Sequence, residues 1–316
     1  MTYFRLGFIV LLAILTSCRS KVLNTPSVLG SPSSQPSPPA LSLGDAMGSV
    51  YMKNQRRTYL LFTPKSYRQG TPAPLVLAFH GYGSQGKDLE RATGFSEVAE
   101  RESFLIVYPD GLDRQWQTGK SFFDRDRDDP AFALTLIRQI AQIRSIDTNR
   151  IYATGVSNGG FLVQYLACQN SKASPRFAVF ATVASTMLKP FQADCPSKAP
   201  ISMLMINGTA DQKIPWLGGI RPYGSLLGVE DTIAFWSRRN GCANNPPARV
   251  SLNKLVEIQR YGNCRSAGEV ELVSLKGIGH LWPRGGGGNN SLLNASQEIW
   301  DFFKRNSLQK RKIKFK

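Results

Sequence analysis

The chain has 316 residues, of which 42% are hydrophobic, and it carries a net charge of +17. This composition is ordinary for a globular protein, and the length suits one large α/β domain or two small ones with a full core. The body has no nucleic-acid recognition motif and no alternation of basic and aromatic residues, so the excess positive charge does not indicate nucleic-acid binding.

The N-terminus is typical of an export signal. Arg5 provides a positive flank, and the apolar stretch 6–16 is too short to span a bilayer comfortably. The stretch ends in Leu15-Thr16-Ser17-Cys18, which looks like a bacterial lipobox and predicts a lipoprotein-type signal peptide over residues 1–18, with Cys18 as the residue that is lipidated after cleavage. We therefore expect a cell-envelope lipoprotein or an extracellular protein. Secretion with a simple cleavage nearby is the alternative.

Three further segments follow from composition. Residues 19–48 are rich in Ser and Pro, which predicts a disordered linker that holds a folded domain away from the membrane. Residues 49–306 are expected to form that domain. Residues 307–316 form a basic C-terminal tail, either simply solvated or attracted to an anionic membrane or cell-wall polymer.

The hydrophobic pattern of the domain predicts strands that alternate with helices. In chain order we expect a strand over 57–62, a buried strand over 75–79, a helix over 87–100, a strand over 104–108, a helix from Asp129-Pro130 to Ile143, a strand over 150–154, a helix over 161–168, a strand over 201–206, a helix over 232–239, a strand over 270–275 and a helix over 296–305. This alternation predicts an α/β fold with a mostly parallel central sheet flanked by helices.

A nucleophile elbow follows the strand expected over 150–154. The motif is Gly155-Val156-Ser157-Asn158-Gly159, and a helix is predicted directly after it. In such an elbow the serine lies on a strained turn at the C-terminal end of the sheet, and glycines are needed because larger residues would collide with neighbouring backbone. Ser157 is the predicted nucleophile. The alternative is a glycine-rich turn with an idle serine.

A carboxylate and a histidine follow in the chain order of a serine hydrolase. Asp211 comes after the strand over 201–206, and His280 comes after the strand over 270–275, so both should reach the sheet edge that carries Ser157. We expect His280 to be the general base and Asp211 to orient it. Asp194 and Asp231 are poorer candidates for the acid, because the first precedes a strand and the second fits a helix start.

His80 is the only other histidine, and it opens His80-Gly81-Tyr82-Gly83 after a buried strand. We expect it to hold this loop by hydrogen bonds rather than to act as the base. A backbone N–H in this loop can point at a developing oxyanion, so Tyr82 and Asn158 are the predicted backbone donors of an oxyanion hole.

Four cysteines remain once Cys18 is set aside. In an exported protein they suggest two disulfides, for which three pairings are possible. Cys168–Cys195 and Cys242–Cys264 are favoured because each closes a short local loop. Buried free thiols are the alternative.

The combined motifs resemble α/β-hydrolase esterases of the group that contains polyhydroxybutyrate depolymerases, feruloyl esterases and acetylxylan esterases. The matching stretches run from Arg57 to Phe303 and include His80-Gly81-Tyr82-Gly83, Tyr108-Pro109-Asp110-Gly111 with Trp116, Gly155-Val156-Ser157-Asn158-Gly159-Gly160, Asn207-Gly208-Thr209-Ala210-Asp211 with Ile214-Pro215, Asn240-Gly241-Cys242 and Gly279-His280-Leu281-Trp282-Pro283. The resemblance implies an α/β-hydrolase fold, a Ser157–Asp211–His280 triad and no cofactor, and it supports the disulfide pairing.

The resemblance also implies an activity. We expect an exported serine carboxylic ester hydrolase that forms an acyl-enzyme on polyhydroxyalkanoate-type esters or on feruloyl or acetyl esters of polysaccharides. A serine peptidase or acyltransferase with the same triad, and a non-catalytic cell-surface binding protein, are the alternatives. The oligomeric state is not indicated.

Two further groups of residues, one aromatic and one acidic, were considered as possible sites. Trp116, Trp216 and Trp282 follow matched motifs and are expected to line an apolar substrate pocket, although each could equally pack in the core. Asp124, Asp126 and Asp128 alternate as in a calcium loop. However, Pro130 follows and no glycine supplies the sharp turn, so we expect no metal.

Overall fold

A computed structural model describes residues 42–53, 55–117, 127–170, 173–195, 200–243, 247–265, 268–285 and 292–308. The predicted signal peptide with Cys18, the linker up to residue 41, two of the three alternating aspartates (residues 124 and 126), and residues 309–316 of the basic tail lie outside these ranges. In the part of the chain that is described, no helix is both long and apolar enough to cross a bilayer.

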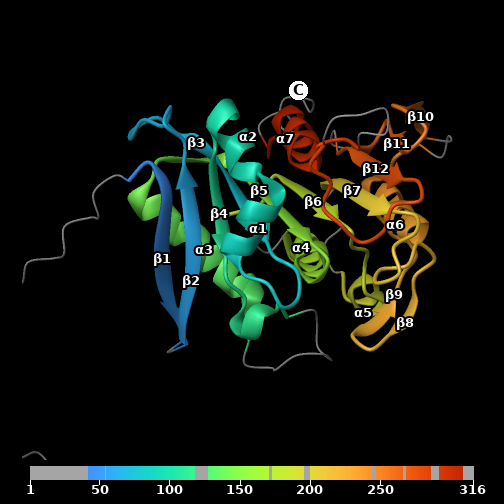
Figure 1. Ribbon diagram of the computed structural model, residues 1–316, viewed down its shortest axis with the longest axis horizontal. Helices are drawn as coiled ribbons and strands as arrows, with labels where there is room; N and C mark the ends of the chain where they lie inside the picture. Colours follow the sequence, from blue (N-terminus) through green and yellow to red (C-terminus); the bar gives the residue numbers. More distant parts are fainter. Residues whose placement is uncertain are drawn as a thin grey trace, which may run out of the picture. The chain divides into compact units, whose positions relative to one another are not determined.

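A ten-stranded sheet forms the centre of the fold, with the strand order β1-β2-β4-β3-β5-β6-β7-β12-β11-β10 (Figure 1). The strands are β1 (Gly44–Met52), β2 (Gln55–Thr63), β3 (Ala73–Phe79), β4 (Leu105–Pro109), β5 (Ile146–Val156), β6 (Val179–Val183), β7 (Ser202–Gly208), β10 (Ala248–Ser251), β11 (Val256–Tyr261) and β12 (Val270–Leu275). From β4 to β12 neighbouring strands are parallel, and antiparallel strands extend both edges. The predicted α/β fold with a mostly parallel sheet is confirmed.

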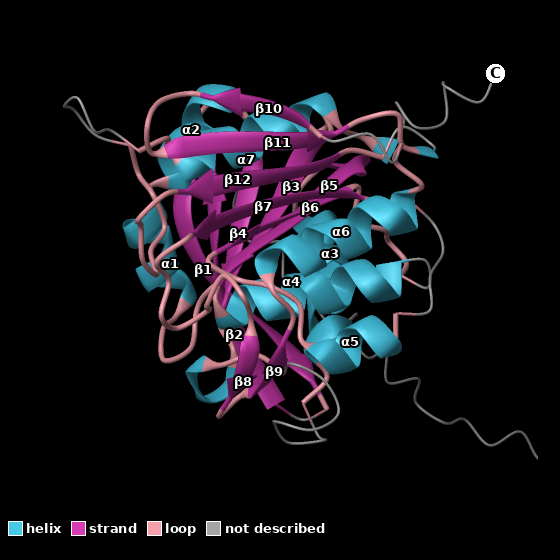
Figure 2. Ribbon diagram, turned by 90° about the vertical axis from the view of Figure 1, so that its right-hand side faces the viewer, coloured by secondary structure: helices cyan, strands magenta, loops and turns pink. Residues whose placement is uncertain are grey.

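Helices cover both faces of the sheet (Figure 2). One face carries α3 (Asp129–Ile143), α4 (Asn158–Gln169) and α6 (Val229–Asn240), and the other carries α1 (Gly86–Thr93), α2 (Phe95–Glu102) and α7 (Ala295–Arg305). The short elements are the 3₁₀ turn η1 (Leu112–Arg114), the helix α5 (Lys189–Ala193) and a hairpin of β8 (Gly219–Arg221) and β9 (Gly224–Leu226) that lies beside α5 (Figure 1).

Strand β3 shows why a central strand has a continuous apolar sequence. Leu75, Leu77 and Phe79 belong to the core under α3 and α4, whereas Val76 and Ala78 belong to the core under α1, α2 and α7. Because side chains alternate between the two faces of a strand and both faces are covered by helices, every position must be apolar. Each such large side chain contributes about 1.5–3 kcal/mol on burial.

The structure corrects two predicted boundaries. The helix expected over 87–100 is two helices, because Gly94 adopts a left-handed conformation (φ 59°) and caps α1. A Cβ at Gly94 would also lie 2.5 Å from a guanidinium nitrogen of Arg284. The predicted linker ends too late, since β1 begins at Gly44 rather than after residue 48. This edge strand mixes glycine and polar residues, so it lacks the apolar alternation that marks a strand.

Two disulfides fasten the helical face that carries α4 and α6. Cys168, in the last turn of α4, is bonded to Cys195, which follows α5. Cys242, which follows α6, is bonded to Cys264, which follows β11. Both pairs are those favoured from the short loops that they close.

Candidate active site

Ser157 occupies a strained turn between β5 and α4. Its backbone has φ 54° and ψ −117°, a conformation that a residue other than glycine rarely adopts and that costs about 1–3 kcal/mol. Hydrogen bonds hold the turn: the Ser157 N–H donates to Val183 O at 3.0 Å, and Ser185 Oγ donates to Ser157 O at 3.0 Å. The strain presents the Ser157 hydroxyl at the C-terminal edge of the sheet.

Glycines make this turn possible because there is no room for side chains around it. A Cβ at Gly159 would lie 2.2 Å from the carbonyl oxygen of Phe79, and a Cβ at Gly155 would lie 2.6 Å from the carbonyl carbon of Gly159. At Gly160 the obstacle is Ser185 Cβ, at 2.4 Å. Close packing around the turn therefore explains why the motif requires glycine at these positions.

Asp211 and His280 meet at the same edge. They follow β7 and β12, which are parallel neighbours, and His280 Nδ1 lies 2.7 Å from Asp211 Oδ2. The other carboxylate oxygen accepts the backbone N–H groups of Lys213 at 2.8 Å and Ile214 at 2.9 Å. The Asp211 side chain is fully buried and that of His280 is 16% exposed. This arrangement fixes the imidazole and leaves its Nε2 on the open side.

A cavity of about 890 Å³ contains Ser157 and His280 in its lining. Apolar side chains make up much of the wall, namely Leu89, Val156, Phe161, Ile214 and Trp282. Within the described residues Ser157 Oγ has no hydrogen-bond partner and neither has His280 Nε2. Such contacts are often long in an unliganded hydrolase and shorten when substrate binds. The cavity brings the serine and the histidine to one reaction space.

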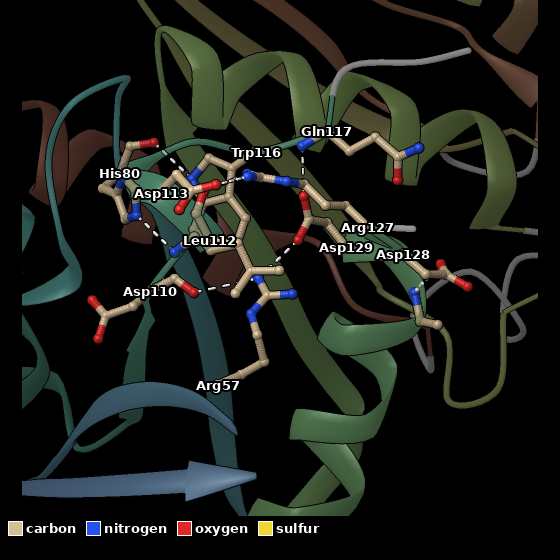
Figure 3. Close-up of polar contacts among 12 residues, drawn as sticks. Arg57, His80, Asp110, Leu112, Asp113, Trp116, Gln117, Arg127, Asp128 and Asp129 are labelled. Carbon is tan, nitrogen blue, oxygen red and sulfur yellow. Dashed lines mark hydrogen bonds and ion pairs between the residues drawn. The ribbon is translucent and has the colours of Figure 1, made fainter. Parts of the chain in front are cut away.

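His80 is buried and holds the loop that follows β3. The N–H of Gly111 donates to His80 Nε2 at 2.9 Å (Figure 3). Nδ1 therefore carries the proton and donates to Gly81 O at 2.7 Å. Burial lowers the pKa of His80, which keeps the ring neutral. The carbonyl of the Gly81–Tyr82 peptide is thereby fixed, and this orients the Tyr82 N–H at its other end.

Trp116 joins this loop to the serine elbow. Its indole Nε1–H donates to His80 O at 2.9 Å, and its backbone N–H donates to Asn158 Oδ1 at 2.7 Å. Asn158 and Tyr82 are the two predicted oxyanion donors, and both line the cavity. Their backbone N–H groups have no hydrogen-bond partner in the described part of the chain, so both remain available to a ligand.

A buried ion pair supports the Trp116 segment from below (Figure 3). Arg57 donates to Asp129 Oδ1 at 2.8 Å, and the other oxygen of Asp129 accepts the Gln117 N–H at 2.5 Å. Both charged side chains are almost completely buried, and the Arg57 guanidinium stacks 3.9 Å from the Phe132 ring centroid. Burial lowers the pKa of Arg57, an effect that the Asp129 carboxylate opposes. The pair anchors the residue next to Trp116.

The three tryptophans that were predicted to line a substrate pocket lie in different surroundings. Trp282 lines the cavity, and its indole N–H donates to Ser296 Oγ at 3.1 Å. Trp116 is fully buried and Trp216 packs against the core, so neither belongs to the cavity lining and both predictions are wrong. Their side chains pack in or against the apolar core instead.

The rival acids Asp194 and Asp231 lie at the end of α5 and in the first turn of α6, while Asp211 holds His280.

Other cavity residues carry no sequence motif. Leu89 and Thr93 come from α1, and Arg221 and Tyr223 come from the hairpin β8–β9. Leu89 and Thr93 are four positions apart on the amphipathic helix α1, so they lie on its buried face. This spacing does not mark them as cavity residues. The turn signals of the hairpin, Gly219, Pro222 and Gly224, do not mark any residue as part of a cavity, so these contacts could be found only from the fold.

Comparisons with known proteins agree with this fold. No protein-family model matches the chain. Feruloyl esterase B of Piromyces equi is 26% identical over 264 residues, which cover 80% of this chain but only 46% of that protein. Feruloyl esterase D of Neurospora crassa is 26% identical over 281 residues, which cover 84% of this chain and 88% of the relative. An acetyl xylan esterase from Aspergillus awamori has a similar structure, with a TM-score of 0.60, 13% sequence identity, and coverage of 82% of this chain and 99% of that one.

The chain has the fold of the α/β hydrolases, and Ser157, Asp211 and His280 lie at one edge of its sheet. Among α/β hydrolases, the chain is similar to the group that contains feruloyl and acetylxylan esterases, as its motifs predicted. These relatives support a carboxylic ester hydrolase.

Proposed function

We propose that the chain is an exported serine esterase that hydrolyses carboxylic esters through an acyl-enzyme. The observation that carries the proposal is the pairing of His280 with Asp211 at the edge of the cavity into which the strained Ser157 points its hydroxyl. The three residues come from distant parts of the chain, and their chemical roles are those that ester hydrolysis requires.

In the first half-reaction Ser157 Oγ attacks the ester carbonyl and its proton passes to His280 Nε2. Asp211 accepts the Nδ1–H, which keeps the tautomer correct and stabilises the imidazolium. The carbonyl oxygen becomes an oxyanion, and the N–H groups of Tyr82 and Asn158 donate to it. Collapse of the tetrahedral intermediate breaks the bond to the alcohol, whose oxygen takes the proton from His280.

The second half-reaction releases the acid. A water molecule gives a proton to His280 Nε2 as its oxygen attacks the acyl carbonyl, and the same oxyanion hole receives the negative charge. When the second intermediate collapses, Ser157 Oγ leaves and takes the proton back from His280. The free enzyme is restored, and no cofactor takes part in these steps.

The cavity favours a bulky acyl group over an acetyl group. Its volume of about 890 Å³ lies in the range of pockets that enclose drug-sized ligands, and Phe161, Ile214 and Trp282 offer an apolar wall to an aromatic ring. Relatives named feruloyl esterase support a hydroxycinnamoyl ester of a polysaccharide as the substrate. Acetylated polysaccharide and hydroxyalkanoate oligomers are the alternative substrates, and the rate measurements described below compare them with a feruloyl ester.

Export completes the proposal. The lipobox-like segment ending at Cys18 supports a lipid anchor in the cell envelope, and the two disulfides support an oxidising compartment. In a bacterial host, Cys18→Ser should shift the protein from the membrane fraction to the soluble fraction. Recovery of the variant in the membrane fraction would reject the lipid anchor but not the esterase.

The esterase is tested by rates on methyl ferulate, acetylated xylan and hydroxybutyrate oligomers. Ser157→Ala should lower kcat by a factor of roughly 10⁶ on any ester that the wild type cleaves. A fluorophosphonate should label the wild type at Ser157. The control is Ser251→Ala, an exposed change on β10 that should leave the rates unaltered. Equal turnover by the wild type and Ser157→Ala would reject the serine mechanism.

A further inference from the structure

One wall of the active-site cavity is built by the segment between β7 and α6. Gln212, Lys213 and Ile214 begin this wall directly after Asp211, and Arg221, Pro222 and Tyr223 complete it from the hairpin β8–β9. Another part of the lining comes from α1 and carries no cation; its residues are Asp88, Leu89, Ala92 and Thr93. The cavity is therefore chemically asymmetric.

The two parts of this wall are tied together. The Tyr223 hydroxyl donates a hydrogen bond to the backbone carbonyl of Lys213, which joins the hairpin to the loop that carries Asp211. At the base of the hairpin, Leu226 is buried and pairs with Leu188 as an isolated bridge. Lys213 and Arg221 are consequently held on the same side of the cavity as the His280–Asp211 pair.

Neither cation of this wall is neutralised. Lys213 and Arg221 make no ion pair with any residue in the described ranges, and the Arg221 guanidinium donates only to the adjacent carbonyl of Ile220, at 2.9 Å. The acidic residue in the cavity lining, Asp88, lies on α1 and pairs with Arg91 at 2.5 Å. Asp211 is buried and already hydrogen-bonded to His280. Two positive charges thus border the reaction space without a counterion among the described residues.

We propose that this cationic wall, Lys213 and Arg221, selects esters that carry a carboxylate near the bond to be cleaved. The inference rests on the proposed esterase function and specifies its substrate class. A guanidinium matches a carboxylate with two parallel hydrogen bonds, and a nearby ammonium adds a point charge. Cations that line a cavity with low-dielectric walls also concentrate anionic substrates there.

A carboxylate can reach the wall from either side of the ester. On the alcohol side it would belong to an acidic sugar next to the esterified one. On the acyl side it would be the free end of a diacid or of a hydroxyacid oligomer. The recognition chemistry is the same in both cases, and matched synthetic esters separate them.

The experiment compares kcat/KM for anionic and neutral esters of nearly equal shape. On the alcohol side the pair is para-carboxyphenyl butyrate and para-carbamoylphenyl butyrate. On the acyl side it is para-nitrophenyl hydrogen adipate and para-nitrophenyl adipamate. The wild type should prefer the anionic ester of at least one pair by about ten-fold, in keeping with one or two charged hydrogen bonds. Added salt should reduce this preference, because the cations are partly exposed.

The variants are Lys213→Gln, Arg221→Gln and the double variant, each compared with Arg221→Lys. The anionic-to-neutral ratio should fall to near one in the double variant and fall only partly in Arg221→Lys, which keeps the charge but loses the planar fork. Lys213→Gln retains the backbone N–H that holds Asp211. Exposed cations far from the cavity, Lys254 and Arg238, provide matched controls, and their change to glutamine should leave the ratio unaltered.

Two results would overturn the inference. A wild-type ratio near one in both pairs means that the wall does not recognise a carboxylate, and a high ratio that survives in the double variant means that other residues do. Hydrolysis of the neutral esters in either case shows that the proposed esterase function stands. If the wild type cleaves none of the four esters, both the function and the inference are rejected.

Discussion

The indole N–H of Trp116 donates to the backbone carbonyl of His80 at 2.9 Å, in the interior of the protein. Trp116 also holds the Asn158 side chain through its own backbone, so one buried residue connects the two loops that carry the proposed oxyanion donors. The distance between those donors is therefore set by residues that no substrate touches.

Trp116→Phe should weaken this connection. The change leaves the buried His80 carbonyl without a partner, which costs about 1–3 kcal/mol of unfolding free energy. We also expect kcat to fall more than KM changes, because oxyanion stabilisation acts in the transition state. Urea denaturation and steady-state ester hydrolysis measure the two effects.

Trp236 provides a matched control. It is also fully buried, and its indole N–H donates to Gln164 Oε1 at 2.6 Å, between α6 and α4 and outside the cavity lining. Trp236→Phe should cost a similar unfolding free energy and leave kcat unaltered. If both variants lose stability and neither loses kcat, Trp116 has no positioning role.

The stability of the protein should depend on His80 at mildly acidic pH. Burial lowers the pKa of His80 below its ordinary value of 6.5, so the folded state resists protonation while the unfolded state accepts the proton. The contribution of neutral His80 is complete above about pH 6.5 and declines as the pH falls towards the lowered value, by at most about 1.4 kcal/mol per pH unit.

Urea unfolding between pH 7 and pH 5 tests this dependence. His80→Asn should be less stable than the wild type at pH 7 and should show a shallower loss as the pH falls. The two proteins differ only at residue 80, so the difference between their curves reports His80. Parallel curves would mean that the folded state does not disfavour the charged ring.

The Arg57–Asp129 pair should show strong coupling. Asp129→Asn leaves a buried guanidinium without its counterion, which we expect to cost about 3–5 kcal/mol of unfolding free energy. The double change Arg57→Met with Asp129→Leu removes both charges and should be more stable than the single variant. Denaturant titration of the wild type, Arg57→Met, Asp129→Leu and the double variant measures the coupling, and additive effects would contradict it.

Each disulfide should stabilise the fold by a similar amount. The sequence separations are 27 residues for Cys168–Cys195 and 22 for Cys242–Cys264, and loops of this size give about 3 kcal/mol each in the chain-entropy account. Replacing both cysteines of one pair by alanine should lower the unfolding free energy by that amount in guanidinium titrations. An unchanged midpoint would show that the bond does not restrict the unfolded chain.

Much of the fold was predictable because β3, β5 and β7 each contain an apolar run, over 73–79, 151–153 and 203–206, and each strand is followed by a motif. The strand β6 was missed because no motif follows Val179–Val183, although this strand is as long as β4. The break at Gly94 was missed because helical periodicity continues on both sides of it. A pattern of residues does not tell a left-handed cap from a tolerated glycine.

The residues of the candidate site were predictable where chemistry restricts the residue type. Ser157, Asp211 and His280 each follow a strand and occur in the chain order that the fold requires. Trp116 was assigned to the pocket because an aromatic residue beside a motif can face either ligand or core, and only the hydrogen bond to His80 decides between them. The ion pair Arg57–Asp129 joins residues 72 positions apart, which no local pattern reveals.

Strand β10 is the last strand at one border of the sheet, and its four residues are all exposed. Arg249 in this strand pairs with Glu257 of β11 at 2.9 Å. So short a charged border offers an incoming chain few backbone groups to pair with. This border of the sheet should consequently resist the edge-on stacking that leads to fibrils.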